Sequence, residues 1–423
     1  MQLNQLVEIN EEGLVARAVS FGLMDDTDKN LKLCKGFVFN HDNDRNRAKS
    51  TTVGVLDAIR RSFHSPNEPN VHLMVQDYGK GKSHFALAVA NFFKLSDESP
   101  EVQGIFNQLK FATSENNATL AELKAYKHRG RHLVLCLSGD KPIDLRKHFL
   151  QVLNKELEAE GVVDSIAQRI CREPLKFLQK LDASQRDRVE TFLSSQGYPF
   201  GDLNKIIQSV TENNFHVIPH IKQICRELTG INPDFNADID IEVIFDDLIA
   251  KLCTGANPQF QGILILFDEM YNYLQQWAAD PIGSGSTALQ NITNACERHK
   301  GKIALVSFTQ KSLSKTIPSK NVEDYNRLVS RIQTSSTYNP KASLELVLDG
   351  LLSQKDTSDW QNFLARWENE LKRLSAEVFN KYAAKLYDGL NWKHAEFYKH
   401  LTIGCFPLHP MTCLLYTSPS PRD

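Results

Sequence analysis

Several short, continuous apolar runs, each ended by polar residues, divide the chain into strand-like units. They cover residues 71–75, 132–137, 262–267 and 303–308. Continuous apolar runs of this length are typical of strands that are covered on both faces. Because segments with helical spacing lie between them, the pattern predicts an α/β fold with a mostly parallel sheet and right-handed crossover helices.

Apolar residues at intervals of three and four positions predict the helices that connect these strands. Thr51 or Thr52 is expected to cap a helix, and the turn at 65–70, rich in Ser, Pro and Asn, is expected to end it. Further helices are expected after residue 82, over about 143–160, from Met270 to Trp277 and around 289–296.

Two long stretches show helical spacing without a strand-like run. Apolar side chains recur at helical intervals in residues 161–250. This stretch predicts a helical insertion that acts as a lid or a partner surface, or alternatively a helical layer packed on the sheet. Residues 341–402 return to amphipathic helices, with apolar positions such as Trp367 and Tyr382.

The pattern divides the chain into a sheet-forming core with helical additions. In chain order we expect an N-terminal lead-in with one or two strands (1–50), the first part of the core (51–150), a helical insertion (151–250), the second part of the core (251–340) and a helical C-terminal region (341–412). Residues 413–423, CLLYTSPSPRD, resemble the translation of a transposase-type sequencing-library adapter. We interpret them as an artefact, which makes the chain a truncated N-terminal fragment; the alternative is a natural Ser/Pro-rich tail.

The composition is that of an ordinary globular protein. The 423 residues are 41% hydrophobic and 24% charged, with a formal net charge of −2. This balance provides no global basic field for nucleic acid, but Lys124, Lys127, His128, Arg129 and Arg131 form a local basic cluster. We interpret the cluster as a solvated helix end, with nucleic-acid contact as the alternative.

Cysteine usage and hydropathy indicate a cytoplasmic protein without a membrane anchor. The 8 cysteines are scattered singly and form no CxxC pair, so a zinc ribbon is not expected. The N-terminus has no basic region followed by an apolar stretch, and no apolar run is long enough to cross a bilayer.

The residues between the 71–75 strand and the next helix form a phosphate-binding pattern. Strand, glycine-containing loop, Lys82-Ser83 and helix follow one another in the order of the P-loop. Backbone N–H groups of such a loop surround phosphate oxygens, and the helix N-terminus adds partial positive charge. Lys82 is expected to reach the β- and γ-phosphates of ATP, and the Ser83 hydroxyl to ligate Mg²⁺. The expected nucleotide contacts are Asp77, Tyr78, Gly79, Lys80, Gly81, Lys82, Ser83 and His84.

The loop departs from the usual motif at one position. Gln76 stands where the pattern GxxxxGK[ST] has its first glycine, and Gly79 is expected to supply the flexibility instead. His84 follows in the first turn of the helix, where it either contacts the site or has a packing or capping role. The departure concerns the geometry of the loop and leaves the chemistry of Lys82 and Ser83 intact.

An acidic pair closes the strand at 262–267. Asp268 is expected to hold Mg²⁺, directly or through water, and Glu269 to orient and polarise the attacking water as general base. This is the Walker B pattern. The adjacent glutamate, together with the additional strand at 132–137 between the two motifs, indicates the catalytic-glutamate (ASCE) branch of P-loop ATPases, which includes AAA+ proteins.

Further polar residues are candidates for roles near the γ-phosphate. Gln310 follows the strand at 303–308 and is expected to sense the γ-phosphate, with Thr309 as the second candidate. Arg331, or else Arg327, is expected to reach the γ-phosphate on a neighbouring subunit. The structural alternatives are a polar strand end that faces solvent and two ordinary surface arginines.

The order of these motifs resembles that of a known family. DYGKGKSHF, ILILFDEMYNYL, IALVSFTQKSL and RLVSRIQTSS follow one another between about residues 51 and 355. The combination resembles the large ATPases of bacterial phage-defence systems, the BrxC and PglY type of the BREX and Pgl systems. The resemblance implies an ATPase that works with DNA-modifying or DNA-sensing partners, often as an oligomer. By that resemblance Lys82, Ser83, Asp268 and Glu269 bind and hydrolyse ATP, Gln310 senses it, and Arg331 acts in trans.

These patterns together predict an enzyme that hydrolyses ATP with Mg²⁺ as cofactor. The expected setting is a homo-oligomer or a multi-protein defence complex, with DNA contacted indirectly or through the missing C-terminal part. Two alternatives stay open. The first is a nucleotide-dependent regulatory or assembly switch of the STAND-like kind. The second is a scaffold with a degenerate nucleotide site, as the departure at Gln76 suggests.

Overall fold

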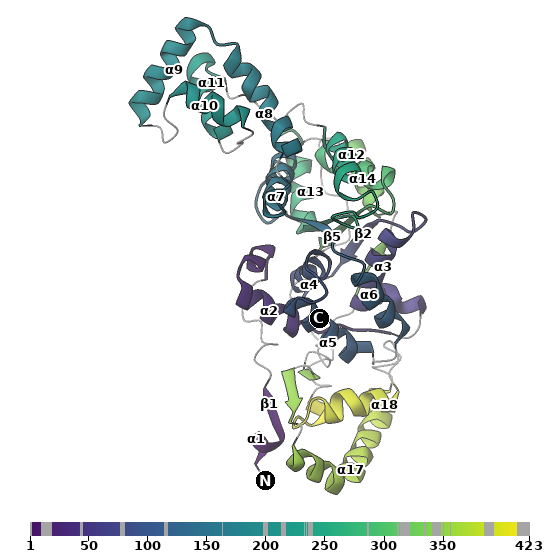
Figure 1. Ribbon diagram of the computed structural model, residues 1–423. Coiled ribbons are helices and arrows are strands. Elements are labelled where there is room, and N and C mark those ends of the chain that lie inside the picture. The colour runs from purple at the N-terminus through teal and green to yellow at the C-terminus, as the bar shows by residue number, and fades with distance from the viewer. Residues whose placement is uncertain are drawn as a thin grey trace.

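The computed structural model describes most of the chain as a helix-rich molecule built around one sheet (Figure 1). The described residues are 2–9, 19–42, 45–76, 81–113, 117–162, 164–197, 202–212, 217–231, 233, 235, 240–285, 287–310, 313, 322–333, 336–340, 348–349, 351–355, 357–384 and 393–412. In Figure 1 the helices α8 to α11 extend from one end of the sheet-containing core, and α17 and α18 lie at the other end.

A five-stranded sheet forms the centre of the molecule. Its strand order is β3-β4-β5-β2-β6, and every neighbouring pair is parallel. The strands are β2 (Val71–Val75), β3 (Leu133–Ser138), β4 (Ile263–Asp268), β5 (Ile303–Thr309) and β6 (Thr337–Tyr338). The parallel α/β fold expected from the sequence is therefore confirmed, and the short edge strand β6 is an addition that the apolar pattern did not indicate.

The two faces of this sheet are covered by different sets of helices. Along β4, Ile263, Ile265 and Phe267 join one buried cluster, whereas Leu264 and Leu266 join the other. Successive side chains of a strand point to opposite faces, so a strand that is apolar at every position needs cover on both sides. This burial explains why the strand sequences are continuous apolar runs without alternation.

The first face is covered by helices that precede β2 or connect it to β3. They are α2 (Thr27–Gly36), α3 (Thr52–His64), α4 (Lys82–Lys94), α5 (Pro100–Thr113) and α6 (Ala118–Lys127). The second face is covered by α7 (Leu145–Ala159), α12 (Ile241–Leu252), α13 (Met270–Ala279), α14 (Ala288–Arg298) and α15 (Val322–Gln333). Shorter 3₁₀ segments are η2 (Phe21–Asp25) and η3 (Arg45–Ser50).

The connections create a topological switch point between β2 and β5. The chain leaves β2 through helices on the first face, and it leaves β5 through α15 on the second face. Neighbouring parallel strands whose connections diverge in this way leave a crevice at their carboxyl ends, and ligands of open α/β sheets bind in such crevices. The fold thus identifies this edge before any side chain is considered.

Local start signals in the sequence act as anticipated. Thr51 is the N-cap of α3, and its hydroxyl accepts a hydrogen bond from the backbone N–H of Gly54 at 3.1 Å. Asp144 likewise caps α7 by accepting a bond from the Lys147 N–H at 3.2 Å. The expected strands at 132–137 and 262–267 each begin and end one residue later, because Asp268 pairs in register with Ser138 and still belongs to β4.

The segment predicted as an insertion is helical throughout its described part. It holds α8 (Asp164–Gln179), α9 (Ala183–Gln196), α10 (Leu203–Thr211) and α11 (Ile218–Thr229), which lie together away from the sheet in Figure 1. The last helix of the segment, α12, instead packs on α14 against the sheet. The segment therefore contains helices away from the sheet and one helix layered on it; its role as a lid or partner surface and the division of the chain into domains stay predictions.

The C-terminal helices form a small cluster of their own. This region has α17 (Ser358–Val378), α18 (His394–Phe397) and the π-helical turns η5 (Phe379–Ala383) and η7 (Tyr398–Ile403). The N-terminal α1 (Leu3–Leu6) and β1 (Val7–Ile9) join it, because β1 pairs antiparallel with β7 (Leu352–Gln354). Trp367 of α17 and Tyr382 of η5 are 43% and 47% exposed, so the apolar face expected along this stretch is only partly covered within the described residues.

Among the described residues, none of the helices is both long and apolar enough to cross a bilayer.

Candidate active site

The candidate site lies at the carboxyl edge of the sheet, where β2, β5 and β4 end side by side. Lys82 and Ser83 begin the helix that follows β2, Gln310 follows β5, and Asp268 ends β4. Parallel strands present their carboxyl ends at the same edge, so residues that are far apart in the sequence meet there. The structure brings four of the residues expected from the sequence together at this edge: Lys82, Asp268, Glu269 and Gln310.

The helix that follows β2 begins with an open N-terminus. Gly81 is the N-cap of α4 with φ 84° and ψ 14°. This is a left-handed backbone conformation that residues other than glycine adopt only at a cost in free energy. Its carbonyl accepts a hydrogen bond from the Phe85 N–H at 2.8 Å, and among the residues that the structure describes no side chain caps the helix. The first backbone N–H groups of α4 are therefore available to an anion. Asp77, Tyr78, Gly79 and Lys80 lie outside the described residues.

A buried ion pair occupies the centre of the site. The Lys82 Nζ lies 3.0 Å from Glu269 Oε1, and the two side chains are only 6% and 12% exposed. Gln310 donates from Nε2 to both carboxylate oxygens of Glu269, at 3.1 Å each. Asn272, on the first turn of α13, lies 3.4 Å from Glu269 Oε2. The Glu269 carboxylate is thus held by one cation and by amide donors in a site with little solvent, where such interactions are strong.

Glu269 has an unusual backbone conformation that aims its side chain. Its φ of 53° and ψ of 38° are left-handed, and among the described residues no other non-glycine residue has a positive φ. The Glu269 N–H donates to Asp268 Oδ1 at 2.9 Å. Left-handed conformations of ordinary residues cost of the order of 1 kcal/mol and cluster at functional sites. The turn between β4 and α13 is therefore strained, and the hydrogen bond from the Glu269 N–H to the Asp268 carboxylate holds it in place.

The backbone around this turn is closely packed. A side chain at Gly139 would place its Cβ 2.5 Å from the carbonyl oxygen of Glu269 and 3.1 Å from Tyr273 Cβ. The Gly139 N–H also donates to the Asp268 carbonyl at 2.9 Å. Glycine is required here because the end of β3 touches the strained turn directly, a contact that the sequence pattern did not indicate.

Asp268 and Ser83 form a pair of oxygen ligands. Burial raises the pKa of the Asp268 carboxyl above its usual value, while the hydrogen bond from the Ser83 hydroxyl and the nearby Lys82 charge oppose that rise. No group of three or more His, Cys, Asp or Glu side chains that could hold a metal occurs among the described residues. Mg²⁺ prefers one or two carboxylate or hydroxyl oxygens together with phosphate oxygens and water, so this pair fits that ion.

Gln76 is buried at the end of β2, and its side chain is turned toward the end of β6. Its side chain is 4% exposed, and its Nε2 donates to the carbonyl of Pro340, just beyond β6, at 3.1 Å. Its backbone N–H donates to the Thr309 carbonyl at 3.0 Å. The residue that replaces the usual glycine therefore ties β2 to the strands on both of its sides.

His84 serves packing in this structure. Its Nε2 lies 2.7 Å from the Leu33 carbonyl oxygen of α2, and its ring meets that of Phe37 edge-on at 5.0 Å. Burial lowers the pKa of this imidazole, which favours the neutral ring. The neutral ring donates a hydrogen bond from Nε2 to the Leu33 carbonyl. The imidazole is turned toward α2, which agrees with the packing alternative of the sequence analysis.

The two candidate arginines lie on α15, away from the ion pair. Arg331 donates from Nη1 to Asn294 Oδ1 of α14 at 2.5 Å, and Asn294 in turn donates to Glu242 Oε1 of α12 at 3.0 Å. Arg331 is in the last turn of α15, which precedes β6 and therefore ends near the amino edge of the sheet. Arg327 is exposed on the same helix. Within this chain, neither arginine joins Lys82 and Glu269, and action on a neighbouring subunit stays a prediction.

Comparison with known proteins adds no relative. No protein-family model matches the chain, and no significant match to a curated protein or to a solved structure was found. The function of the chain is therefore inferred from the geometry of this site.

Proposed function

We propose that this chain binds ATP with Mg²⁺ at the carboxyl edge of its sheet, between β2 and β5, and hydrolyses it to ADP and phosphate. The observation that carries this proposal is the convergence of buried Lys82 with half-buried Glu269 and Gln310 in one cluster, at distances of 3.0 and 3.1 Å. The switch point of the sheet and the uncapped N-terminus of α4 support the same location. The fold is proposed to be that of an ASCE-type P-loop ATPase.

Each residue of the cluster has a distinct proposed task. Lys82 exchanges Glu269 for phosphate oxygens, which explains why the free protein needs a carboxylate at this place to neutralise a buried ammonium group. Ser83 and Asp268 supply oxygens to Mg²⁺, which neutralises phosphate charge when bound. The backbone N–H groups at the start of α4 add donors without any side-chain charge.

Glu269 is proposed as the general base once Lys82 has turned to phosphate. It accepts a proton from a water molecule whose oxygen attacks the γ-phosphorus, while the bond from that phosphorus to the bridging oxygen breaks and ADP leaves. Gln310 holds both oxygens of the carboxylate, so it fixes the orientation of the base and is placed to respond to the γ-phosphate. The strained turn at Glu269 supports a role for which position matters more than local stability.

The resemblance to BREX and Pgl-type ATPases suggests the biological setting. By that resemblance we propose an anti-phage defence component that acts in the cytoplasm with DNA-modifying partners, as a homo-oligomer or in a multi-protein complex. Arg331 would then act in trans after releasing Asn294, the partner that holds it within the chain.

One observation favours a second function. Gln76 ties the strand before the phosphate loop to Pro340, so nucleotide-dependent movement of the loop would be passed to the segment that follows β6. A nucleotide-dependent assembly switch with weak or no hydrolysis uses the same residues for binding. In that case nucleotide would promote assembly of the chain without release of phosphate.

The two functions separate in a phosphate-release assay on the wild-type chain and on Glu269→Gln. We expect slow release of phosphate by the wild type and a fall of about 10² to 10⁴ in Glu269→Gln, which keeps its affinity for ATP because Lys82 no longer has a carboxylate to displace. Glu173→Gln, on an exposed carboxylate that pairs with Lys176, is the matched control and keeps full turnover. Equal turnover in all three chains would refute the assignment of Glu269, and nucleotide binding without any release would favour the switch.

A further inference from the structure

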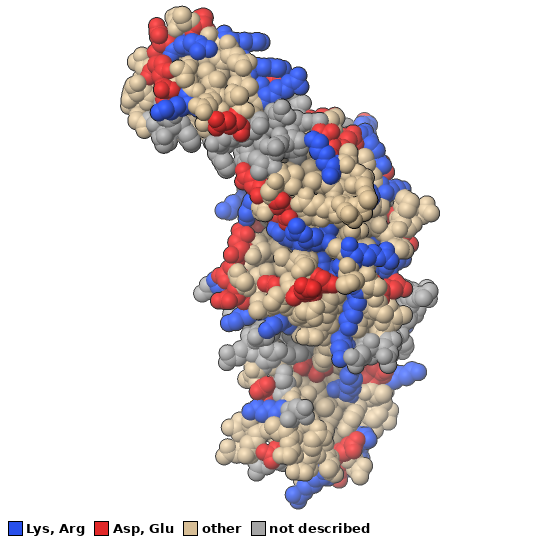
Figure 2. Space-filling model, viewed as in Figure 1, with Lys and Arg blue, Asp and Glu red and all other residues tan. Residues whose placement is uncertain are grey.

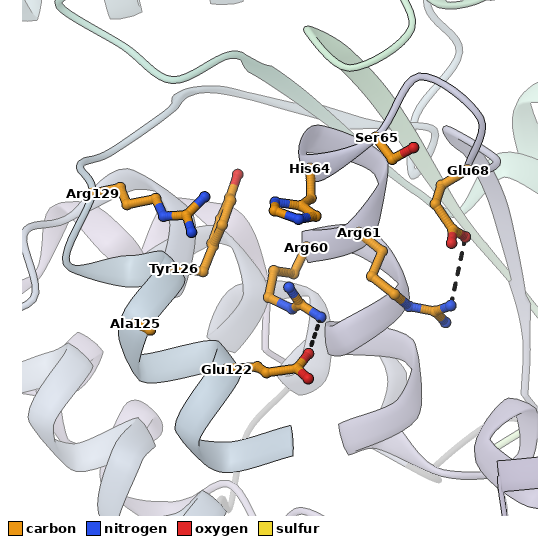
Figure 3. A pocket seen from close by; sticks show the side chains of 9 residues that line it. All are labelled: Arg60, Arg61, His64, Ser65, Glu68, Glu122, Ala125, Tyr126 and Arg129. Carbon is orange, nitrogen blue, oxygen red and sulfur yellow. Dashed lines mark hydrogen bonds and ion pairs between the residues drawn. The ribbon is translucent and has the colours of Figure 1, made fainter. Parts of the chain in front are cut away.

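A cavity lined by charged side chains lies between the C-terminal ends of α3 and α6, on the opposite edge of the sheet from Lys82. It measures about 390 Å³ and is lined from both helices and from the turn that follows α3 (Figure 3). Because α3 ends only a few residues before β2 begins, the cavity is at the amino edge of the sheet. Its size is within the range of small-molecule sites, about 300–1,000 Å³.

Cationic side chains dominate the chemistry of this cavity. Three guanidinium groups, those of Arg60, Arg61 and Arg129, line it together with two carboxylates, those of Glu68 and Glu122, and the imidazole of His64. In Figure 3, His64, Arg60 and Arg61 reach in from α3, whereas Tyr126 and Arg129 come from the α6 side. In Figure 2, Lys and Arg side chains gather over this same part of the molecule.

The guanidinium groups differ in how firmly they are held. Arg60 is 6% exposed and is fixed by Asp57 at 2.8 Å and by Glu122 at 2.5 Å, so it is part of the wall. Arg61 is tied more loosely, to Asp57 at 3.2 Å and to Glu68 at 3.5 Å, with its side chain 42% exposed. Exposed ion pairs of this kind contribute little energy, so Arg61 can exchange Glu68 for a stronger acceptor.

Arg129 and His64 are the groups that no carboxylate compensates. Among the described residues, neither side chain has an ion-pair or hydrogen-bond partner, although both line the cavity. Basic residues near a helix C-terminus often serve only to balance the helix dipole, and this explains Arg61 and His64 in the last turn of α3. The same account extends to Arg129, which follows the C-cap of α6 and donates its backbone N–H to the Tyr126 carbonyl at 3.0 Å; what distinguishes Arg129 is that its side chain lines the cavity without an ion-pair partner among the described residues.

We propose that this cavity binds a phosphate group, held by Arg129 and His64 with Arg61 as the third donor. A guanidinium presents paired N–H donors that match phosphate oxygens, and the imidazole and the second guanidinium would complete the donor set. The source is either a free phosphorylated small molecule or the backbone of a nucleic acid. Of the basic residues noted at 124–131, only Arg129 lines this cavity, so the proposal concerns Arg129 and not the whole cluster.

The test uses the Lys82→Ala chain, so that the proposed ATP site does not contribute. Inorganic pyrophosphate is titrated calorimetrically at low salt, and a labelled single strand of about 20 nucleotides is followed by fluorescence anisotropy. The variants are Arg129→Ala, Arg129→Lys and His64→Ala. Arg373→Ala is the matched control, because this arginine is exposed on α17 and pairs only with its own helix neighbour Glu370.

The phosphate site predicts that Arg129→Ala and His64→Ala each weaken binding about tenfold, with partial recovery in Arg129→Lys and no change in Arg373→Ala. Binding of pyrophosphate identifies a free phosphorylated ligand. Binding of the strand alone, with a salt dependence reduced by about one charge in Arg129→Ala, identifies nucleic acid. Absence of both, or equal weakening by Arg373→Ala, overturns the proposal. Because Lys82 is already removed, failure here leaves the ATPase proposal untouched.

Discussion

The two edges of the same sheet use charged residues in opposite ways. At the carboxyl edge, buried Lys82 and half-buried Glu269 and Gln310 bind one another, and the Ser83 hydroxyl bonds Asp268. At the amino edge, Arg61, His64 and Arg129 around the α3–α6 cavity are partly or fully exposed, although Arg60 is buried, and Arg129 is in no ion pair within the described part of the chain. The polar groups of the carboxyl edge thus bind one another, whereas some basic side chains of the amino edge are left without an ion-pair partner among the described residues.

This difference has consequences for how each edge meets a ligand. A ligand at the carboxyl edge must replace an internal ion pair, so binding there is coupled to a rearrangement of Lys82 and Glu269. A ligand at the amino edge has only exposed, weak pairs to disturb. The carboxyl edge is therefore suited to chemistry that has to be switched on, and the amino edge to simple recognition.

The first way to sharpen the comparison is to remove the donor that orients Glu269. Gln310→Ala deletes two hydrogen bonds to the carboxylate, and we expect turnover to fall by about 10- to 100-fold with little loss of ATP binding. Gln208→Ala, on the exposed face of α10 where it bonds Glu212, is the control and keeps its rate. The turnover of both variants is measured by steady-state phosphate release. Equal rates in the two variants would show that Gln310 has no role in hydrolysis.

The amino edge is expected to respond to acid through its buried histidines. His72 lies between Ser62 Oγ at 2.7 Å and Tyr338 OH at 3.2 Å, and burial lowers its pKa from 6.5 to about 3. Since the unfolded chain takes up the proton first, stability is complete above pH 6.5 and is lost as the pH falls from there toward 3. Each such histidine contributes about 1.4 kcal/mol per pH unit in this window.

Urea unfolding at several pH values checks this expectation. His72→Gln, which keeps a polar side chain, should show a shallower loss of stability between pH 6 and pH 4 than the wild type, by about one proton. His132, whose pKa burial lowers in the same direction, remains and keeps part of the slope. Parallel slopes in the two chains would mean that His72 is not a buried neutral imidazole.

The smallest expected effect compares two aspartates. Burial raises the pKa of Asp268, so its negative charge opposes folding at every pH above its ordinary value of 3.8. Asp268→Asn should therefore raise the free energy of unfolding of the ligand-free chain slightly, by less than about 1 kcal/mol, although it removes Mg²⁺-dependent activity. Asp246→Asn should have the opposite sign, because that carboxylate pairs with Arg298 and His299. A destabilised Asp268→Asn would contradict the cost assigned to this charge.

The sequence predicted the elements of the core well, because their signals are local. Continuous apolar runs identified β2 to β5, and Thr51 identified the start of α3. The convergence of Lys82 with Glu269 was expected from motif order, whereas the direct ion pair was not, since the motifs describe residues in contact with a ligand. His84, Gly139 and the α3–α6 cavity depend on contacts between distant segments, which periodicity does not encode.

The central claim is that Lys82 binds the phosphates of a nucleotide at the carboxyl edge. The most direct measurement is the affinity for ATP with Mg²⁺ of Lys82→Ala beside Lys94→Ala, a lysine of the same helix that pairs with Glu156 at 2.6 Å and lies at its other end. The account predicts a loss of at least about a hundredfold in Lys82→Ala and wild-type affinity in Lys94→Ala. Equal affinities in the two variants would contradict it.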